Sequence, residues 1–172
     1  SEAEALPGVA CILHHGNVER IPYTTAGQGW PEPSPYDSFL FDRKVRFVGD
    51  RVAAVAAESE EVAEEALRLI RVEYKVLPAV FSPEEALADG APVIHDEEDA
   101  TGIHDAQHNI AAAVDIPVGD IERGFSESDV VVEATCELPY SQHTPIEPHC
   151  TVAYFDEDGR LVIRTSTQVP FH

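Results

Sequence analysis

The chain has 172 residues, 44% of them hydrophobic, and 32 acidic residues against 11 basic ones give a formal net charge of −21. This length and apolar content predict one globular domain, or one domain and part of a second, and exclude a disordered chain. So acidic a protein has no basic patch to displace phosphate counterions, which argues against nucleic acid and anionic membranes as partners.

Cysteine usage and hydropathy narrow the class of protein further. The three cysteines, Cys11, Cys136 and Cys150, form no Cys-x-x-Cys pair, which argues against a disulfide framework and a four-thiolate zinc site. No signal peptide is visible, and no apolar run approaches the ~20 residues of a membrane span. We therefore expect a cytoplasmic protein.

The first forty residues alternate short elements with one long loop. Residues 1–6 predict a helix that ends at Pro7-Gly8, and residues 9–13 predict a short buried strand. Residues 22–38 are rich in proline and glycine, and long loops of this kind tend to be functional or interface-forming. Trp30 lies in this loop, either as an anchor on the core or as a contact with a neighbouring domain.

The next segment predicts the order strand, strand, helix, strand. Apolar runs at residues 45–48 and 52–57 flank Gly49-Asp50, a signal for a two-residue hairpin. Ser59 is a candidate N-cap for a helix whose apolar residues recur at helical spacing up to residue 70. Alternation of apolar and charged residues over 72–76 then predicts a strand with one solvated face.

A capping box, SPEE at residues 82–85, opens a short helix that we expect to end near residues 89–90. Residues 91–119 read as an irregular linker that contains an acidic run at 96–99. A helix at 121–125, a strand at 130–138 and a hairpin of residues 150–155 and 161–164 follow. Because the chain starts inside a predicted helix and stops on a predicted strand, both ends look cut. An exposed strand would then promote self-association.

Two polar clusters are candidate metal sites. The first comprises His95, His104 and His108 with Asp96, Asp99 and Asp105, and the second is the segment QHTPIEPHC at residues 142–150. Their alternative interpretations are solvated loop histidines and a rigid turn that satisfies backbone groups. His104 and His108 have i, i+4 spacing, but no convincing helix supports it, and the spacing of residues 142–150 matches no zinc pattern. The sequence also holds no phosphate-binding glycine loop and no G-x-S-x-G, so these residues alone assign no catalytic or metal-ligating side chain.

A family resemblance goes further. The run VRFVGDRVAAVAAE at residues 45–58, AEEA at 63–66 and VEYKVLPAV at 72–80 closely resemble the α/β-hammerhead domain of the xanthine dehydrogenase and aldehyde oxidase family. LPGV at 6–9, PEEAL at 83–87 and APVIH at 91–95 also fit. GDIERGF at 119–125, HTPIEPH at 143–149 and STQ at 166–168 resemble the start of the molybdenum-cofactor-binding region of that family.

The resemblance implies a fold of the α+β class: an α/β-hammerhead with a mixed or antiparallel sheet and flanking helices, then a short β-rich segment of a second, truncated domain. The implied limits are residues 1–98 for the hammerhead domain, 99–119 for a linker and 120–172 for the N-terminal portion of the molybdopterin-binding domain.

Members of this family are molybdenum hydroxylases, which insert a water-derived oxygen at a carbon of an aldehyde or N-heterocycle. Their electrons leave through molybdopterin, 2Fe–2S clusters and usually FAD. By resemblance, Gln168 is the cofactor-binding residue, whose amide donates a hydrogen bond to the apical oxygen ligand of molybdenum without adding charge. The glycine-rich segment and the glutamate base of the family are absent, so Glu147 is not assigned as a catalytic base.

The implied partners are the remainder of the molybdenum subunit and the iron–sulfur and flavin domains or subunits, in a homo-oligomeric parent enzyme. This chain alone is expected to be inactive and to hold no cofactor. The alternative hypothesis is a free-standing acidic binding module that has the hammerhead fold, because a fold does not by itself imply a function.

Overall fold

The computed structural model describes residues 1–25, 34–139 and 141–167. It divides into two compact units, residues 1–115 and 116–172. Trp30 and Gln168, to which the sequence analysis gave roles, lie outside the described residues. The secondary structure consists of short helices and two antiparallel two-stranded sheets, which confirms the predicted α+β class.

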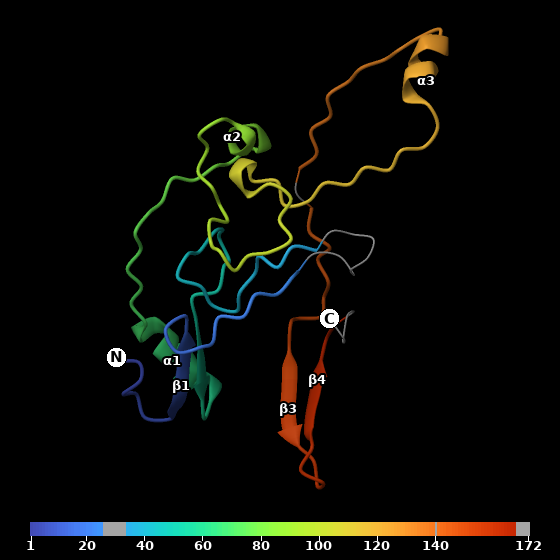
Figure 1. Cartoon of the computed structure of the whole chain (residues 1–172). Coiled ribbons are helices and arrows are strands. Elements are labelled where there is room, and N and C mark those ends of the chain that lie inside the picture. The colour runs from blue at the N-terminus through green and yellow to red at the C-terminus, as the bar shows by residue number, and fades with distance from the viewer. Residues whose placement is uncertain (26–33, 140, 168–172) are drawn as a thin grey trace. The chain divides into compact units, whose positions relative to one another are not determined.

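The first unit is built around one strand pair and one helix (Figure 1). Strand β1 (Val9–His14) pairs antiparallel with β2 (Ala53–Ala57), with Ile12 opposite Val55. Helix α1 (Glu60–Leu69) packs against both strands. The core forms where they meet: Ala3, Ile12 and Ala66 are buried, and partly buried side chains of Leu6, Val9, Val55, Leu69 and Ile70 surround them.

Helix α1 confirms the predicted helix that begins after the N-cap Ser59 and runs up to residue 70. The hydroxyl of Ser59 accepts a hydrogen bond from the backbone N–H of Val62, and Glu60 and Glu61 lie at the positive end of the helix dipole. Near the other end, Arg68 pairs with Glu64 one turn earlier, with 2.8 Å between Nη2 and Oε2. Local chemistry therefore accounts for the start of this helix, and the Glu64–Arg68 pair supports its last turns.

Three elements predicted in the first unit are wrong. Residues 1–6 form turns rather than a helix, and residues 72–76 form no strand. The strand before Gly49 is also absent, because β2 pairs with β1 and not with residues 45–48. Gly49, with φ of 107°, does mark a turn, in which the backbone N–H of Asp50 bonds to the carbonyl of Phe47. The turn belongs to a loop, and the side chains of Phe47 and Val48 are exposed.

The rest of the first unit is mostly irregular. Helix α2 (Pro83–Leu87) begins at its predicted cap, where the hydroxyl of Ser82 accepts from the backbone N–H of Glu85 at 3.1 Å. A short 3-10 helix, η1 (Ala106–His108), follows within the segment predicted as a linker. Backbone bonds join Tyr36 to Thr101 and Asp105 to Ile110. The proposed domain limits remain a prediction.

The second unit contains one helix and one hairpin. Helix α3 (Ile121–Glu127) starts at its predicted position, with Asp120 as N-cap, and extends two residues beyond the predicted end. Residues 130–138, predicted as a strand, pair with none of the described residues. Strands β3 (Thr151–Phe155) and β4 (Leu161–Thr165) lie side by side in Figure 1 and confirm the predicted hairpin. At its turn, Asp156 Oδ1 accepts from the backbone N–H groups of Asp158 and Arg160.

Candidate functional site

The first unit holds a compact ion-pair cluster around Asp42. Arg20 Nε lies 3.1 Å from Asp42 Oδ1, and Arg46 Nη1 lies 2.8 Å from Asp42 Oδ2. The guanidinium carbon of Arg20 lies 3.6 Å above the ring centroid of Phe39, which is itself buried. The ring and the carboxylate together hold the two arginines in place, through cation–π and charge-assisted contacts.

The electrostatics of Asp42 follow from these contacts. Burial by itself would raise the pKa of the carboxyl group, but hydrogen bonds from Arg20, Arg46 and the backbone N–H of Arg43 outweigh it and lower the pKa to about 2. Asp42 is therefore a carboxylate throughout the physiological range. A permanently ionised, fully paired group of this kind is suited to structure and unsuited to proton transfer.

Two histidines of the first candidate metal site, His95 and His108, each pair with a different carboxylate, and the backbone N–H of His104 donates to the carbonyl of Ala111. Nδ1 of His95 lies 2.7 Å from Glu97 Oε1, and Nδ1 of His108 lies 2.6 Å from Asp105 Oδ2. The hydrogen bond to Asp105 raises the pKa of His108. Within the described residues, neither this segment nor residues 142–150 brings together three side chains that could hold a metal ion.

A cavity of about 210 Å³ lies in the same unit. Its apolar lining residues are Ile94, Ile103, Ala106 and Ala111. Its polar lining residues are Asp37, His95 and Asn109. The amide of Asn109 is fully used, since Oδ1 accepts from the backbone N–H of Ile94 and Nδ2 donates to the carbonyls of Ala86 and Pro92. Asn109 thus ties the chain after α2 to the chain after η1.

The second unit presents a different set of side chains, at the open end of the β3–β4 hairpin. The hydroxyls of Thr151 and Thr165 lie 2.7 Å apart, directly across the strand pair. An open pocket of about 430 Å³ lies at this end, lined by Glu147, Pro148, Cys150, Arg164, Thr165 and Ser166. This pocket unites part of the 142–150 segment with Ser166, although the two are separate in sequence.

The polar side chains that line this pocket are suited to hydrogen bonding with a ligand. Arg164 and the hydroxyls of Thr165 and Ser166 can donate to oxygen atoms of a ligand, beside the carboxylate of Glu147, and the Thr165 hydroxyl also bonds to Thr151. Within the described residues, this pocket offers no set of three side chains that would ligate a metal directly. Gln168, predicted as cofactor-binding, lies outside the described residues and its role stays a prediction. Sequence reasoning missed Arg164, although its place in β4 opposite Val152 follows from the predicted hairpin.

Two protein-family models match the chain, one after the other. Residues 1–78 match the domain described as "Aldehyde oxidase and xanthine dehydrogenase, a/b hammerhead domain". Residues 103–172 match the "Molybdopterin cofactor-binding domain". The hammerhead prediction and the predicted start of a cofactor-binding domain are both confirmed.

Individual proteins give the same result. The chain is 46% identical to "Probable hypoxanthine oxidase XdhD" of Escherichia coli (strain K12), over 100% of this chain and 21% of that protein. It is 34% identical to "Putative xanthine dehydrogenase molybdenum-binding subunit XdhA" of the same strain, over 98% of this chain and 22% of that protein. The solved aldehyde oxidoreductase from Desulfovibrio gigas matches with a TM-score of 0.66 and 29% identity, covering 95% of this chain and 18% of that one. The chain thus spans about a fifth of the length of the relatives it matches.

Proposed function

Because this chain belongs to the xanthine dehydrogenase and aldehyde oxidase family, we propose that it contributes to a molybdenum hydroxylase as the hammerhead domain and the first part of the cofactor-binding domain. The parent enzyme hydroxylates a carbon of an N-heterocycle or an aldehyde with water-derived oxygen. The observation that carries this proposal is the order of the two matches, which together leave only residues 79–102 uncovered. We assign the remaining parts of the active site to sequence outside this chain.

The names of the relatives support a class of substrate. Two Escherichia coli relatives carry purine names, hypoxanthine oxidase and xanthine dehydrogenase, and the first is 46% identical to this chain. The solved relative is an aldehyde oxidoreductase, at 29% identity. We therefore place purine-type heterocycles first among the proposed substrates, and aldehydes second.

The pocket at the open end of the hairpin is the proposed contact with the cofactor. Arg164, Thr165 and Ser166 offer a cation and hydroxyl donors, which fit the phosphate and polar ring atoms of a pterin cofactor. When bound, the molybdopterin cofactor would supply redox-active molybdenum, which would take up electrons from the substrate. This chain's contribution is to hold the cofactor by hydrogen bonds, and we expect no direct protein ligand to the metal from the described residues.

Gln168 follows Ser166 on the same segment, and we propose that its side-chain amide donates a hydrogen bond to the bound cofactor. An amide donor orients an oxygen atom without changing the net charge of the site, which suits a group whose redox state changes. We assign the 2Fe–2S clusters and FAD, which would accept the electrons, to other domains or subunits of a homo-oligomeric parent.

The test uses the complete polypeptide that contains this sequence, produced with molybdate and purified anaerobically. We expect stoichiometric molybdenum by elemental analysis and oxidation of hypoxanthine or an aldehyde. Gln168→Ala should keep the metal and lower kcat by roughly a hundredfold, the usual cost of one preorganised donor. Gln107→Ala is the matched control, because Gln107 is exposed on η1 in the first unit, and it should behave as the wild type.

Two outcomes separate the alternatives. A complete polypeptide that carries no molybdenum and oxidises neither substrate class would refute the proposal and favour the acidic binding module. The 172-residue chain by itself should carry no stoichiometric molybdenum, because it spans only about a fifth of its relatives. Stoichiometric metal on this chain would contradict the assignment of the remaining active-site parts to other sequence.

A further inference from the structure

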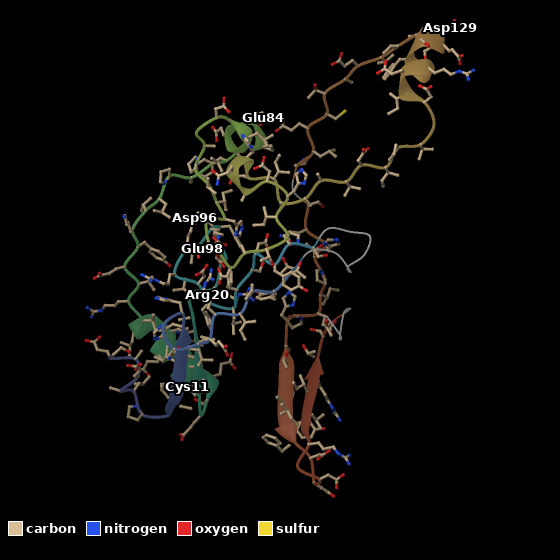
Figure 2. All side chains as sticks on the ribbon, in the orientation of Figure 1. Cys11, Arg20, Glu84, Asp96, Glu98 and Asp129 are labelled. Atoms are coloured by element: carbon tan, nitrogen blue, oxygen red, sulfur yellow. The ribbon has the colours of Figure 1, made fainter. Side chains whose placement is uncertain are left out.

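Three of the four residues in the acidic run 96–99 form ion pairs with cations much earlier in the sequence. Lys44 Nζ lies 2.7 Å from Asp96 Oδ1, and Arg46 Nη2 lies 2.8 Å from Glu97 Oε2. Arg20 pairs with Asp99. Glu98 is exposed and forms no ion pair with any other described residue. Figure 2 shows Arg20, Asp96 and Glu98 in the same part of the first unit.

The burial of these pairs is graded. The side chain of Asp96 is 65% exposed and that of Asp99 is 45% exposed, whereas Glu97 and Arg46 are only 12% and 9% exposed. Exposed ion pairs are weak because water and salt screen them. A buried pair depends far more on its partner, because an unpaired buried charge is strongly unfavourable. The pair between Glu97 and Arg46 is therefore the contact whose loss matters most.

The environment of Glu97 supports this ranking. One carboxylate oxygen, Oε1, lies 2.7 Å from Nδ1 of His95. The other, Oε2, is buried and lies 2.8 Å from Arg46 Nη2 as an ion pair without hydrogen-bond geometry, so its compensation comes from the charge of Arg46. Burial by itself would raise the pKa of Glu97, but the contacts with His95 and Arg46 outweigh burial and lower it. The partner Arg46 is in turn anchored by Asp42 at 2.8 Å and by the carbonyl of Lys44 at 2.8 Å.

Further contacts hold the backbone on both sides of the acidic run. Lys44 Nζ also donates to the carbonyl of Val93, at 3.1 Å. The backbone N–H of Ile94 donates to Asn109 Oδ1 at 2.8 Å, and the N–H of Thr101 donates to the carbonyl of Tyr36 at 3.2 Å. Ile94 and His95 also line the cavity of about 210 Å³.

We propose that Asp96, Glu97 and Asp99 form an ionic strap that fastens the chain between α2 and η1 onto residues 42–46 and Arg20, with Glu97 as its central contact. The strap holds the backbone that leads into residues 103–172, the part that matches the cofactor-binding domain. Residues 96–99, which lie in the segment predicted as an irregular linker, thus make specific contacts with distant parts of the first unit. This proposal goes beyond the proposed function and is independent of any cofactor.

The test compares Glu97→Gln with Glu98→Gln in the 172-residue chain by amide hydrogen exchange. Both changes remove one negative charge from the same acidic run, so the two variants have the same net charge. We expect E97Q to speed exchange at the amides of Ile94 and Thr101 by about tenfold or more, through local opening, while amides of β1 and α1 keep their protection. E98Q should leave all of these rates within about twofold of the wild type.

Equal exchange rates at Ile94 and Thr101 in E97Q and E98Q would overturn the strap. If E97Q unfolds the whole first unit, the double variant K44Q/D99N provides the test, because it removes the two outer pairs while the pair of Glu97 with Arg46 stays intact. It should speed exchange at the same two amides by about threefold without global unfolding. Unchanged rates in that variant would refute the proposal.

Discussion

Arg46 Nη1 lies 2.8 Å from Asp42 Oδ2, and both side chains are only 9% exposed. Arg46 also pairs with Glu97, and Asp42 also pairs with Arg20, so this one contact joins two further pairs into a network. Because each charge has lost most of its water, each depends on the others for compensation. This part of the first unit has little regular secondary structure. The ion-pair network joins its segments there, as the backbone hydrogen bonds of a sheet would elsewhere.

Removing the central carboxylate should destabilise the first unit. Asp42→Asn leaves Arg20 and Arg46 with less compensation at a largely buried position, so we expect a loss of roughly 2–4 kcal/mol in the free energy of unfolding. Urea denaturation followed by far-UV circular dichroism measures it. Asp129→Asn, at an exposed residue of the second unit, is the charge-matched control and should cost less than about 0.5 kcal/mol. Equal losses in the two variants would contradict the network.

Protonation of Asp42 should lower the free energy of unfolding in acid. The folded-state pKa of Asp42 is about 2, below the ordinary value of 3.8, so the folded state binds its proton less readily than the unfolded state. Its stabilisation is therefore complete above pH 4 and is lost as the pH falls from about 4 to about 2, a change of about 2 kcal/mol. Urea midpoints between pH 7 and pH 2 measure this.

The variant Asp42→Asn supplies the control for that experiment. Without the carboxylate, the part of the acid dependence that belongs to residue 42 disappears, so the stability curve should fall less steeply below pH 4. A wild-type curve that is parallel to the variant's curve from pH 4 to pH 2 would show that Asp42 is not the titrating group.

The cap of α1 should contribute independently of the charges. Ser59→Ala removes the side-chain acceptor for the backbone N–H of Val62, and we expect a cost of about 1 kcal/mol in the free energy of unfolding of the first unit. Ser141→Ala, at an exposed residue outside any helix or strand, should be neutral. An α1 whose amide exchange is equally protected in both variants would argue that packing of Ala66 alone holds the helix.

The second unit should make the chain self-associate. The side chains of Val152, Phe155, Leu161 and Ile163 are all more than half exposed, on a two-stranded ribbon whose strands are both edges within the described residues. Exposed edges and apolar side chains promote pairing between copies. Sedimentation velocity should show concentration-dependent oligomers that Ile163→Lys reduces. A monomer at high concentration would contradict the prediction.

Some features of this chain depend only on residues close together in sequence, and local sequence patterns predict them. Ser59 and Ser82 cap their helices, Asp120 caps a third, and the turn at residues 156–159 closes the β3–β4 hairpin. In each case the donor and acceptor are within four residues of each other, so no knowledge of the rest of the fold is needed. Family membership was also readable, because it depends on the order of motifs along the chain.

Only the tertiary structure decided which distant segments meet. The β2 strand has an apolar pattern that suits several partners, and it pairs with β1, more than forty residues earlier, instead of the adjacent run before Gly49. The acidic run 96–99 and the cations at Arg20 and residues 42–46 were both visible in the sequence, yet their pairing was not. A carboxylate can pair with any cation, and an apolar strand can pair with many other strands. Which of these pairs form is therefore decided by the segments that the fold brings together.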